Sequence, residues 1–329
     1  MYAQYDVAGL GNAIVDVIAS VDDKFLLEQH IAKGVMTLID EFRAQQLYRA
    51  LPDPQEIAGG SAANTMAGLA SLGGNGLFIG KAKDDRLGAS FARSLKTIGV
   101  RFKTKMAVDG PPTACSLIVV TPDGHRSMNT HLGASREIMP SDIDESEIVA
   151  AQILYVEGYL WDAPEAKAAI NEAIWIAKRA ERRVALTLSD PFCVARWRDE
   201  FHDLLTNIDI LFANEEEAKA LFETQDFDET LEALRAWPGV AALTRSEKGC
   251  VIACMEEVHV IDAMPIDHVV DTTGAGDQFA AGFLYGLTHG KGLADSARLG
   301  ALAASEVISH YGARPERSLA RMAEQAGLL

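Results

Sequence analysis

Asp271-Thr272-Thr273-Gly274-Ala275-Gly276-Asp277-Gln278-Phe279 is the stretch that decides how the rest of the chain is interpreted. It is a turn of small residues that opens onto an apolar run, residues 279–287, which is compatible with a buried helix. The backbone N–H groups in the first turn of a helix have no intrahelical partner, and the helix dipole favours negative charge there. We therefore expect residues 274–276 to hold a phosphoryl group.

Asp277 follows that turn at once, and its carboxylate can take a proton from an attacking hydroxyl. A helix N-terminus is expected to lower the pKa of Asp277, which weakens it as a base. Phosphoryl transfer through a loose transition state demands little of its base, so this objection is not decisive. The alternative is a plain glycine-rich turn with an acidic residue in the first helical turn, and local chemistry alone leaves both open.

The second half of the chain has the alternating strand and helix pattern of an α/β protein. Strand-like and helical stretches alternate, which predicts a mostly parallel sheet with helices on both faces; the strand-like ones are residues 153–156, 184–188, 208–212 and 240–243. Ligands bind beyond the carboxyl ends of strands in such sheets. Asn12, Asn214, Thr244 and the 271 turn all follow predicted strands, so we expect them at one edge.

Short strand-like segments in the first half interrupt this rhythm. They lie at residues 35–39, 101–107, 113–121 and 126–130. We predict a single domain, residues 1–329, that carries a small β-sheet lid formed from about residues 13–55 and 103–131.

Polar side chains follow the first predicted strand. Ile14, Asp16 and Ile18 alternate as in extended chain, where residues an even number of steps apart face the same side. Asn12 and Asp16 would then lie side by side, and an amide next to a carboxylate can hydrogen-bond a diol. The alternative is an Asx turn followed by a solvent-facing aspartate.

Two further polar pairs have a structural and a functional interpretation. Ser61 and Asn64 share one face at the start of a predicted helix, where Ser61 is either a ligand contact or a plain N-cap. Asn214 and Glu217 are either good helix-capping chemistry or oxygen groups near a hydrated Mg²⁺.

Composition excludes some function classes. The formal net charge is −17, which argues against nucleic-acid or anionic-membrane binding, although a local donor cluster can still hold a small anion. The 4 cysteines form no CxxC motif, as expected in a reducing compartment. No signal peptide or bilayer-spanning stretch is apparent, so we expect a soluble cytoplasmic protein.

Three motifs together resemble the ribokinase-like (PfkB) carbohydrate kinase family, and within it the adenosine kinase branch. They are Gly59-Gly60-Ser61-Ala62-Ala63-Asn64, the pair Asn214 and Glu217 in an NxxE pattern, and the 271–277 stretch. The resemblance implies a three-layer α/β sandwich with a small β-sheet lid. It also implies a kinase that uses ATP and Mg²⁺, and in some members K⁺, to phosphorylate the 5′-hydroxyl of adenosine or a related purine nucleoside.

The resemblance also assigns site residues. It makes Asp277 the base and Arg126 a phosphate ligand, with Gly274, Ala275 and Gly276 as the anion hole. The nucleoside contacts it implies are Asn12, Asp16, Met36, Gly60, Ser61, Asn64, Met128, Thr130 and Tyr159. Asn214, Thr244 and Gly249 fall on the ATP side, Glu217 would hold Mg²⁺ through water, and Asp271 matches a monovalent-cation position.

The branch rests on fewer residues than the family. Residues 11–16 and 188–192 look like adenosine kinase stretches, whereas sugar-specific members carry Asp-x-Asn at the second of these. Lys83 departs from the Val-Gly that often precedes the family's Asp-x-x-Gly. Two alternatives stay open: a sugar kinase acting on ribose, fructose or a sugar phosphate, and a catalytically idle nucleoside-binding protein. The partners expected are small molecules, and the chain is either a monomer or a homodimer.

Overall fold

A nine-stranded sheet forms the body of the molecule in the computed structural model, which describes residues 3–255 and 257–329. Its strand order is β14-β13-β12-β11-β10-β9-β1-β5-β6. The strands are β1 Tyr5–Leu10, β5 Gly76–Ile79, β6 Arg101–Phe102, β9 Ala151–Glu157, β10 Arg183–Thr187, β11 Ile210–Asn214, β12 Val240–Thr244, β13 Cys250–Cys254 and β14 Glu257–Ile261. Neighbours from β6 to β12 pair in parallel, and β13 and β14 add an antiparallel edge, which confirms the mostly parallel sheet.

Helices cover both faces of this sheet because its central strands are apolar on both sides. In β1, Val7 belongs to the apolar cluster on one face and Ala8 to the cluster on the other. The first face is covered by α3 Ser61–Ser71, α4 Arg86–Thr97, α10 Ala275–Thr288, α11 Leu293–Val307 and α12 Leu319–Gln325. The second is covered by α5 Glu145–Val149, α6 Pro164–Arg179, α7 Pro191–Leu204, α8 Glu215–Phe222 and α9 Phe227–Arg235. The result is the predicted three-layer sandwich.

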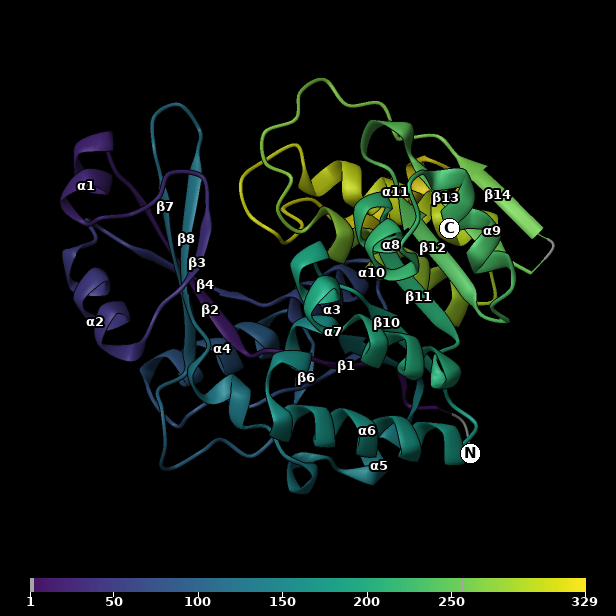
Figure 1. The fold of residues 1–329 in the computed structure, drawn as a ribbon, viewed down its shortest axis with the longest axis horizontal. Helices are drawn as coiled ribbons and strands as arrows, with labels where there is room; N and C mark the ends of the chain where they lie inside the picture. Colours follow the sequence, from purple (N-terminus) through teal and green to yellow (C-terminus); the bar gives the residue numbers. More distant parts are fainter. Residues whose placement is uncertain (1–2, 256) are drawn as a thin grey trace.

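A separate five-stranded sheet stands to one side of the body (Figure 1). Its order is β3-β8-β7-β2-β4, with β2 Ile14–Ser20, β3 Met36–Leu38, β4 Gln55–Gly59, β7 Ala114–Val120 and β8 Arg126–His131. Two capped helices, α1 Asp23–Glu28 and α2 Glu41–Ala50, pack on it through buried Leu26 and Leu47. The strand expected at residues 35–39 thus pairs with the one expected at 126–130.

The segment 101–107 differs from its expectation as one strand of the small block. Only Arg101–Phe102 is a strand, and it joins the large sheet beside β5. The reason is aromatic packing, since the Phe102 ring lies 5.9 Å from Phe78 and 5.6 Å from Phe91. Ala107 makes only an isolated bridge to Lys83.

Helix α7 begins at Pro191. Asp190 caps it by accepting a hydrogen bond from the N–H of Cys193, and proline suits the first helical position. Two helices, α5 and α9, are additions that the sequence pattern did not predict.

Helices α3 and α10 lie in close contact, and this contact positions the site. A Cβ on Gly68 would come within 2.0 Å of Gln278 Oε1 and 2.7 Å of Ala281 Cβ, so only glycine fits there. Gln278 Nε2 in turn donates to the backbone oxygen of Asn64 at 3.0 Å. The N-termini of the two helices are therefore held side by side, although their sequences are more than 200 residues apart.

Candidate active site

A cavity of about 870 Å³ lies between the two sheets, beyond the carboxyl ends of β9, β10, β11 and β12. Most residues expected at the site line it: Asn12, Asp16, Met36, Gly60, Ser61, Met128, Thr130, Tyr159, Asn214, Glu217, Thr244, Gly274, Ala275, Gly276 and Asp277. Residues 274–277 of the glycine turn thus share one cavity with Asn12 and Asp16. Four expected residues do not line it: Asn64, Arg126, Gly249 and Asp271.

Asp277 is held by two groups from the start of α3. Ser61 Oγ donates to its Oδ1 at 2.6 Å, and Asn64 Nδ2 donates to its Oδ2 at 3.4 Å. Ser61 therefore does more than begin a helix, because its hydroxyl is turned to the carboxylate of another helix. Both bonds favour the ionised form of Asp277.

The pKa of Asp277 is raised to about 7, opposite to the direction expected from the helix N-terminus. Burial is the largest cause, and the negative charges of Glu157 and Asp16 add to it, while the bonds from Ser61 and Asn64 oppose it. The helix-end effect is local and modest, whereas loss of water acts on the whole carboxylate. A base with this pKa is well matched to neutral pH.

The glycine turn presents free donors next to this acid. Gly274 has φ +80°, and a Cβ there would come within 2.7 Å of Ala313 Cα, so the turn requires glycine. The N–H of Ala275 donates to the Thr272 oxygen at 3.2 Å. Within the described part of the chain, the N–H groups of Gly276 and Asp277 have no acceptor, and they are the donors left for an anion.

Glu157, at the carboxyl end of β9, is a site residue that sequence reasoning missed. Its carboxylate accepts from Asn12 Nδ2 at 2.7 Å, and from the N–H of Ala62 at 2.9 Å. A Cβ on Gly11 would meet Glu157 Oε2 at 2.3 Å. The expected pairing of Asn12 with Asp16 is thus replaced by a bond to Glu157. An acid that ends an apolar strand was the signal available in the sequence.

Asp16 extends from β2 into the cavity and has no hydrogen-bond donor among the residues that the structure describes. A Cβ on Gly59 would lie 2.3 Å from Asp16 Oδ2, so glycine leaves room for this carboxylate. Burial raises the pKa of Asp16 to about 6, against the opposing charges of Arg314 and Arg126. A half-buried carboxylate without a donor is a strong acceptor for hydroxyl groups of a ligand.

Asn214 and Glu217 confirm the capping interpretation, and both side chains also line the cavity. Asn214 caps α8, and the two residues form a reciprocal capping box, with Asn214 Nδ2 donating to Glu217 Oε1 at 2.6 Å. Burial raises the pKa of Glu217 to about 7, and the charges of Asp190 and Asp277 add to the rise. This convergence of carboxylates on one cavity fits a hydrated Mg²⁺, although the described residues hold no cluster of three or more metal-ligating side chains.

Arg126 and Asp271 bond to each other, which joins β8 of the small sheet to the turn before α10. Asp271 also accepts from the N–H and Oγ1 of Thr273, at 3.0 and 2.7 Å, and from the N–H of Gly312 at 3.1 Å. Burial alone would raise the pKa of Asp271, but these bonds and the Arg126 charge lower it overall. In this state Arg126 contacts Asp271 rather than the cavity.

The wall expected for the nucleobase combines residues of the five-stranded sheet with a residue of the main body. Met36, Met128 and Thr130 come from the small sheet, and Tyr159 comes from the segment after β9. The Tyr159 hydroxyl donates to the Ser189 oxygen at 3.1 Å, and Phe192, an unpredicted lining residue, has 77% of its surface exposed. These side chains form an apolar wall with few donors.

Of the residues expected to contact ATP, Thr244 lies opposite Cys250 in the β12–β13 pair. Gly249 has φ +78°, and a Cβ there would meet the Ile261 oxygen at 2.1 Å. Its role is therefore to close the turn that carries Ser246, which does line the cavity.

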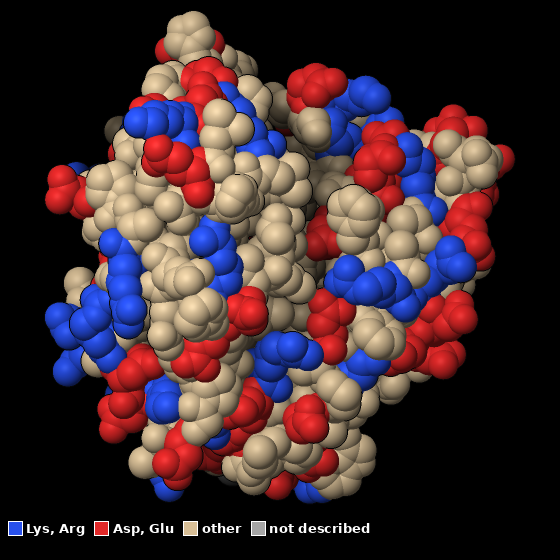
Figure 2. Space-filling view, turned by 60° about the vertical axis from the view of Figure 1, so that its left-hand side comes forward, with Lys and Arg blue, Asp and Glu red and all other residues tan. Residues whose placement is uncertain are grey.

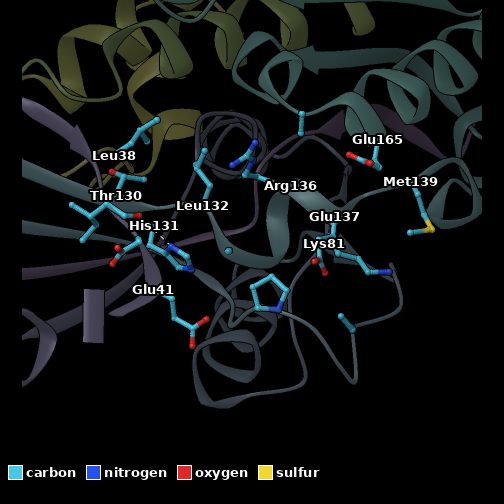
Figure 3. A pocket seen from close by; sticks show the side chains of 16 residues that line it. Leu38, Glu41, Lys81, Thr130, His131, Leu132, Arg136, Glu137, Met139 and Glu165 are labelled. Carbon is cyan, nitrogen blue, oxygen red and sulfur yellow. Dashed lines mark hydrogen bonds between the residues drawn. The ribbon is translucent and has the colours of Figure 1, made fainter. Parts of the chain in front are cut away.

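A second cavity of about 880 Å³ adjoins the first and shares Leu38, Thr130 and Leu132 with it (Figure 3). Its polar side chains are of mixed charge, including Lys81, Arg136 and Glu165. On the face drawn in Figure 2, positive and negative side chains are interspersed. Among the described residues, no helix has the length and apolarity needed to span a bilayer.

Comparison with known proteins gives one consistent result. A family model described as pfkB family carbohydrate kinase matches residues 36–319. A probable sugar kinase from Rhizobium etli CFN 42 is 47% identical, with a TM-score of 0.93 over 99% of this chain and 100% of that one. An adenosine kinase from Sinorhizobium meliloti is 50% identical, with a TM-score of 0.91 over 98% and 100%. The adenosine kinase of Saccharomyces cerevisiae is 26% identical over 92% of this chain and 94% of its own. The family match spans well over half of the sequence, and this chain belongs to the pfkB family of carbohydrate kinases.

Proposed function

We propose that this protein transfers the γ-phosphoryl group of ATP to the 5′-hydroxyl of adenosine, or of a closely related purine nucleoside, with Asp277 as the base. The observation that carries the proposal is the position of Asp277. It lies at the free donors of the glycine turn, is held by Ser61 and Asn64, and shares its cavity with the partnerless carboxylate of Asp16.

In this proposal, different residues of the cavity bind the ribose, receive the base, take the proton and stabilise the phosphoryl group. Asp16 accepts hydrogen bonds from the ribose hydroxyls, and the apolar wall of Met36, Met128 and Tyr159 receives the base. The 5′-hydroxyl then attacks the phosphorus as Asp277 takes its proton. The N–H groups of Gly276 and Asp277 stabilise the charge of the transferred group. Mg²⁺, held through water by Glu217, would neutralise charge on the ATP phosphates.

Adenosine is preferred as the acceptor because two of the relatives described above are adenosine kinases, one of them at 50% identity. A sugar kinase is the second candidate, since the Rhizobium relative is named a probable sugar kinase. A panel of adenosine, inosine, ribose, fructose and ribose phosphates, with ADP formation measured, separates them. Turnover confined to sugars would overturn the nucleoside proposal. Thermal stabilisation by adenosine without ATP consumption would indicate an idle binding protein.

We further propose that the five-stranded sheet acts as a lid, formed from about residues 13–55 and 103–131. It carries Asp16, Met36, Met128 and Thr130 over the cavity, so closure would exclude water that competes as acceptor. The free cysteines, three of them buried, support a role in the reducing cytoplasm, as either a monomer or a homodimer.

The raised pKa values of Asp16 and Asp277 predict that the rate falls at acidic pH. We expect kcat/KM for the nucleoside to fall on acidification with a midpoint between about pH 6 and 7, because Asp16 and Asp277 must be ionised. Groups whose folded pKa is raised stabilise the protein as pH falls, so thermal stability should not decrease between pH 8 and 6. Activity and melting temperature measured across this window would contradict the account if they fell together.

Monovalent-cation binding at Asp271 does not fit this structure. A carboxylate offers about four acceptor positions, and four donors from Arg126, Thr273 and Gly312 already occupy those of Asp271. We therefore predict that replacing KCl by tetramethylammonium chloride at constant ionic strength leaves kcat unchanged. A loss of more than about tenfold, restored by K⁺ alone, would show that Arg126 leaves Asp271 to a cation.

A further inference from the structure

Arg314 lies in the segment between α11 and α12, behind the wall of the cavity rather than in it. Its Nε donates to Asn64 Oδ1 at 3.1 Å, and its Nη1 donates to Ser94 Oγ at 3.1 Å. Its Nη2 is buried and has no hydrogen-bond partner among the described residues. A guanidinium with a buried, unused donor is costly, so its retention needs an explanation from its surroundings.

The segment that carries Arg314 is fixed by buried contacts. Glu306, which is 2% exposed, accepts from the N–H groups of Glu316 and Arg317 at 3.1 and 2.8 Å. The backbone oxygen of Ala313 accepts a hydrogen bond at 2.9 Å from Nε2 of Gln278, the residue that follows Asp277. Arg314 is therefore positioned against both helices of the site rather than lying free on the surface.

The bond to Asn64 sets the direction of its amide. Arginine can only donate, so the Asn64 oxygen must face Arg314. The NH₂ group of Asn64 then points to Asp277 Oδ2, 3.4 Å away, where it can only serve an acceptor. The two hydrogen bonds therefore run in one direction, from Arg314 to Asn64 and from Asn64 to Asp277. This arrangement favours the ionised form of Asp277.

The charges around Asp277 need this compensation. Titratable groups facing it from β2, the end of β9, α8 and the Arg314 segment are Asp16, Tyr155, Glu157, Tyr159, Glu217 and Arg314. Arg314 is the positive member of this set. Burial lowers the pKa of Arg314 to about 10, with the charges of Asp16 and Asp277 opposing the fall, so it stays protonated at neutral pH.

We propose that Arg314 is a positioning residue that turns the Asn64 amide toward Asp277 and keeps the Asp277 carboxylate charged. It does not touch the substrate. The proposal rests on the proposed function only in naming Asp277 as the base, and its main readout does not require turnover.

The test measures the titration of Asp277 in the whole protein by NMR of ¹³C-carboxyl-labelled aspartate, with the resonance assigned from Asp277→Asn. Arg314→Gln keeps a donor for Asn64 but removes the charge. We expect the Asp277 midpoint to rise by about one pH unit in this variant, and kcat/KM at pH 6.5 to fall about tenfold with recovery near pH 9. Arg314→Lys should restore the midpoint. Arg317→Gln, an exposed arginine in the same segment, should behave as wild type.

The outcomes separate the two proposals. An unchanged Asp277 midpoint in Arg314→Gln, or a loss of rate that is equal at every pH, overturns the positioning role and leaves the kinase proposal intact. If the Asp277 midpoint shifts in a protein that phosphorylates no acceptor, the positioning role of Arg314 stands and the kinase proposal is overturned. If Arg314→Gln does not fold, a second uncharged variant, Arg314→Met, decides: an unchanged Asp277 midpoint in that variant overturns the role.

Discussion

Replacing Asp277 by asparagine should lower kcat by about 10²–10⁴-fold while nucleoside binding is largely kept. Asparagine has the same shape but cannot take the proton of the attacking hydroxyl. Steady-state kinetics give kcat, and calorimetric titration with adenosine in the absence of ATP gives the dissociation constant. Turnover close to that of the wild type would remove Asp277 from its role as base.

The same substitution should not destabilise the protein. Asp277 is half-buried near Glu157 and Asp16, whose charges raise its pKa, and asparagine removes one of these like charges. A melting temperature equal to or above that of the wild type at pH 8 is therefore expected. A large drop in melting temperature would mean that the loss of kcat reflects unfolding rather than chemistry.

Replacing Asp16 by alanine should raise the KM for the nucleoside by about 10²-fold or more, with a smaller effect on kcat. A site built to hydrogen-bond substrate hydroxyls loses most of its discrimination when its acceptor is removed. The wild type should discriminate strongly between adenosine and 2′,3′-dideoxyadenosine, and the variant should not. The ratio of kcat/KM for these two acceptors measures this.

Glu165→Ala is the matched control for Asp16. Glu165 is an exposed acid that lines only the second cavity, so its removal changes the net charge equally without touching the nucleoside site. It should leave the KM unchanged. If Asp16→Ala left the KM unchanged for every acceptor, the assignment of Asp16 to the ribose would be wrong.

Local patterns in the sequence were enough to find most of the site. The 271–277 turn, the glycine pair before Ser61 and the polar residues that follow strands were visible because each depends on a few neighbouring residues. The alternation around Asp16 predicted β2, and the βα rhythm predicted the parallel sheet. Since strands of a parallel sheet end at one edge, these residues were expected together.

Contacts between distant segments were not visible in the same way. Asn64 and Arg314 meet across 250 residues, and Asn12 meets Glu157 across 145. The pKa of Asp277 was expected to fall because the helix end is a local feature, whereas it rises through burial and through acids from other strands. The fold determines these long-range contacts and the rise in the pKa of Asp277, and neither can be predicted from a short sequence motif.

The most direct test identifies the product of the wild-type protein. Adenosine and ATP with Mg²⁺ are incubated with the enzyme, and the products are followed by ³¹P NMR and chromatography. The account predicts adenosine 5′-monophosphate and ADP in equal amounts. ADP formed without a phosphorylated nucleoside, or phosphate found on another hydroxyl, would contradict it.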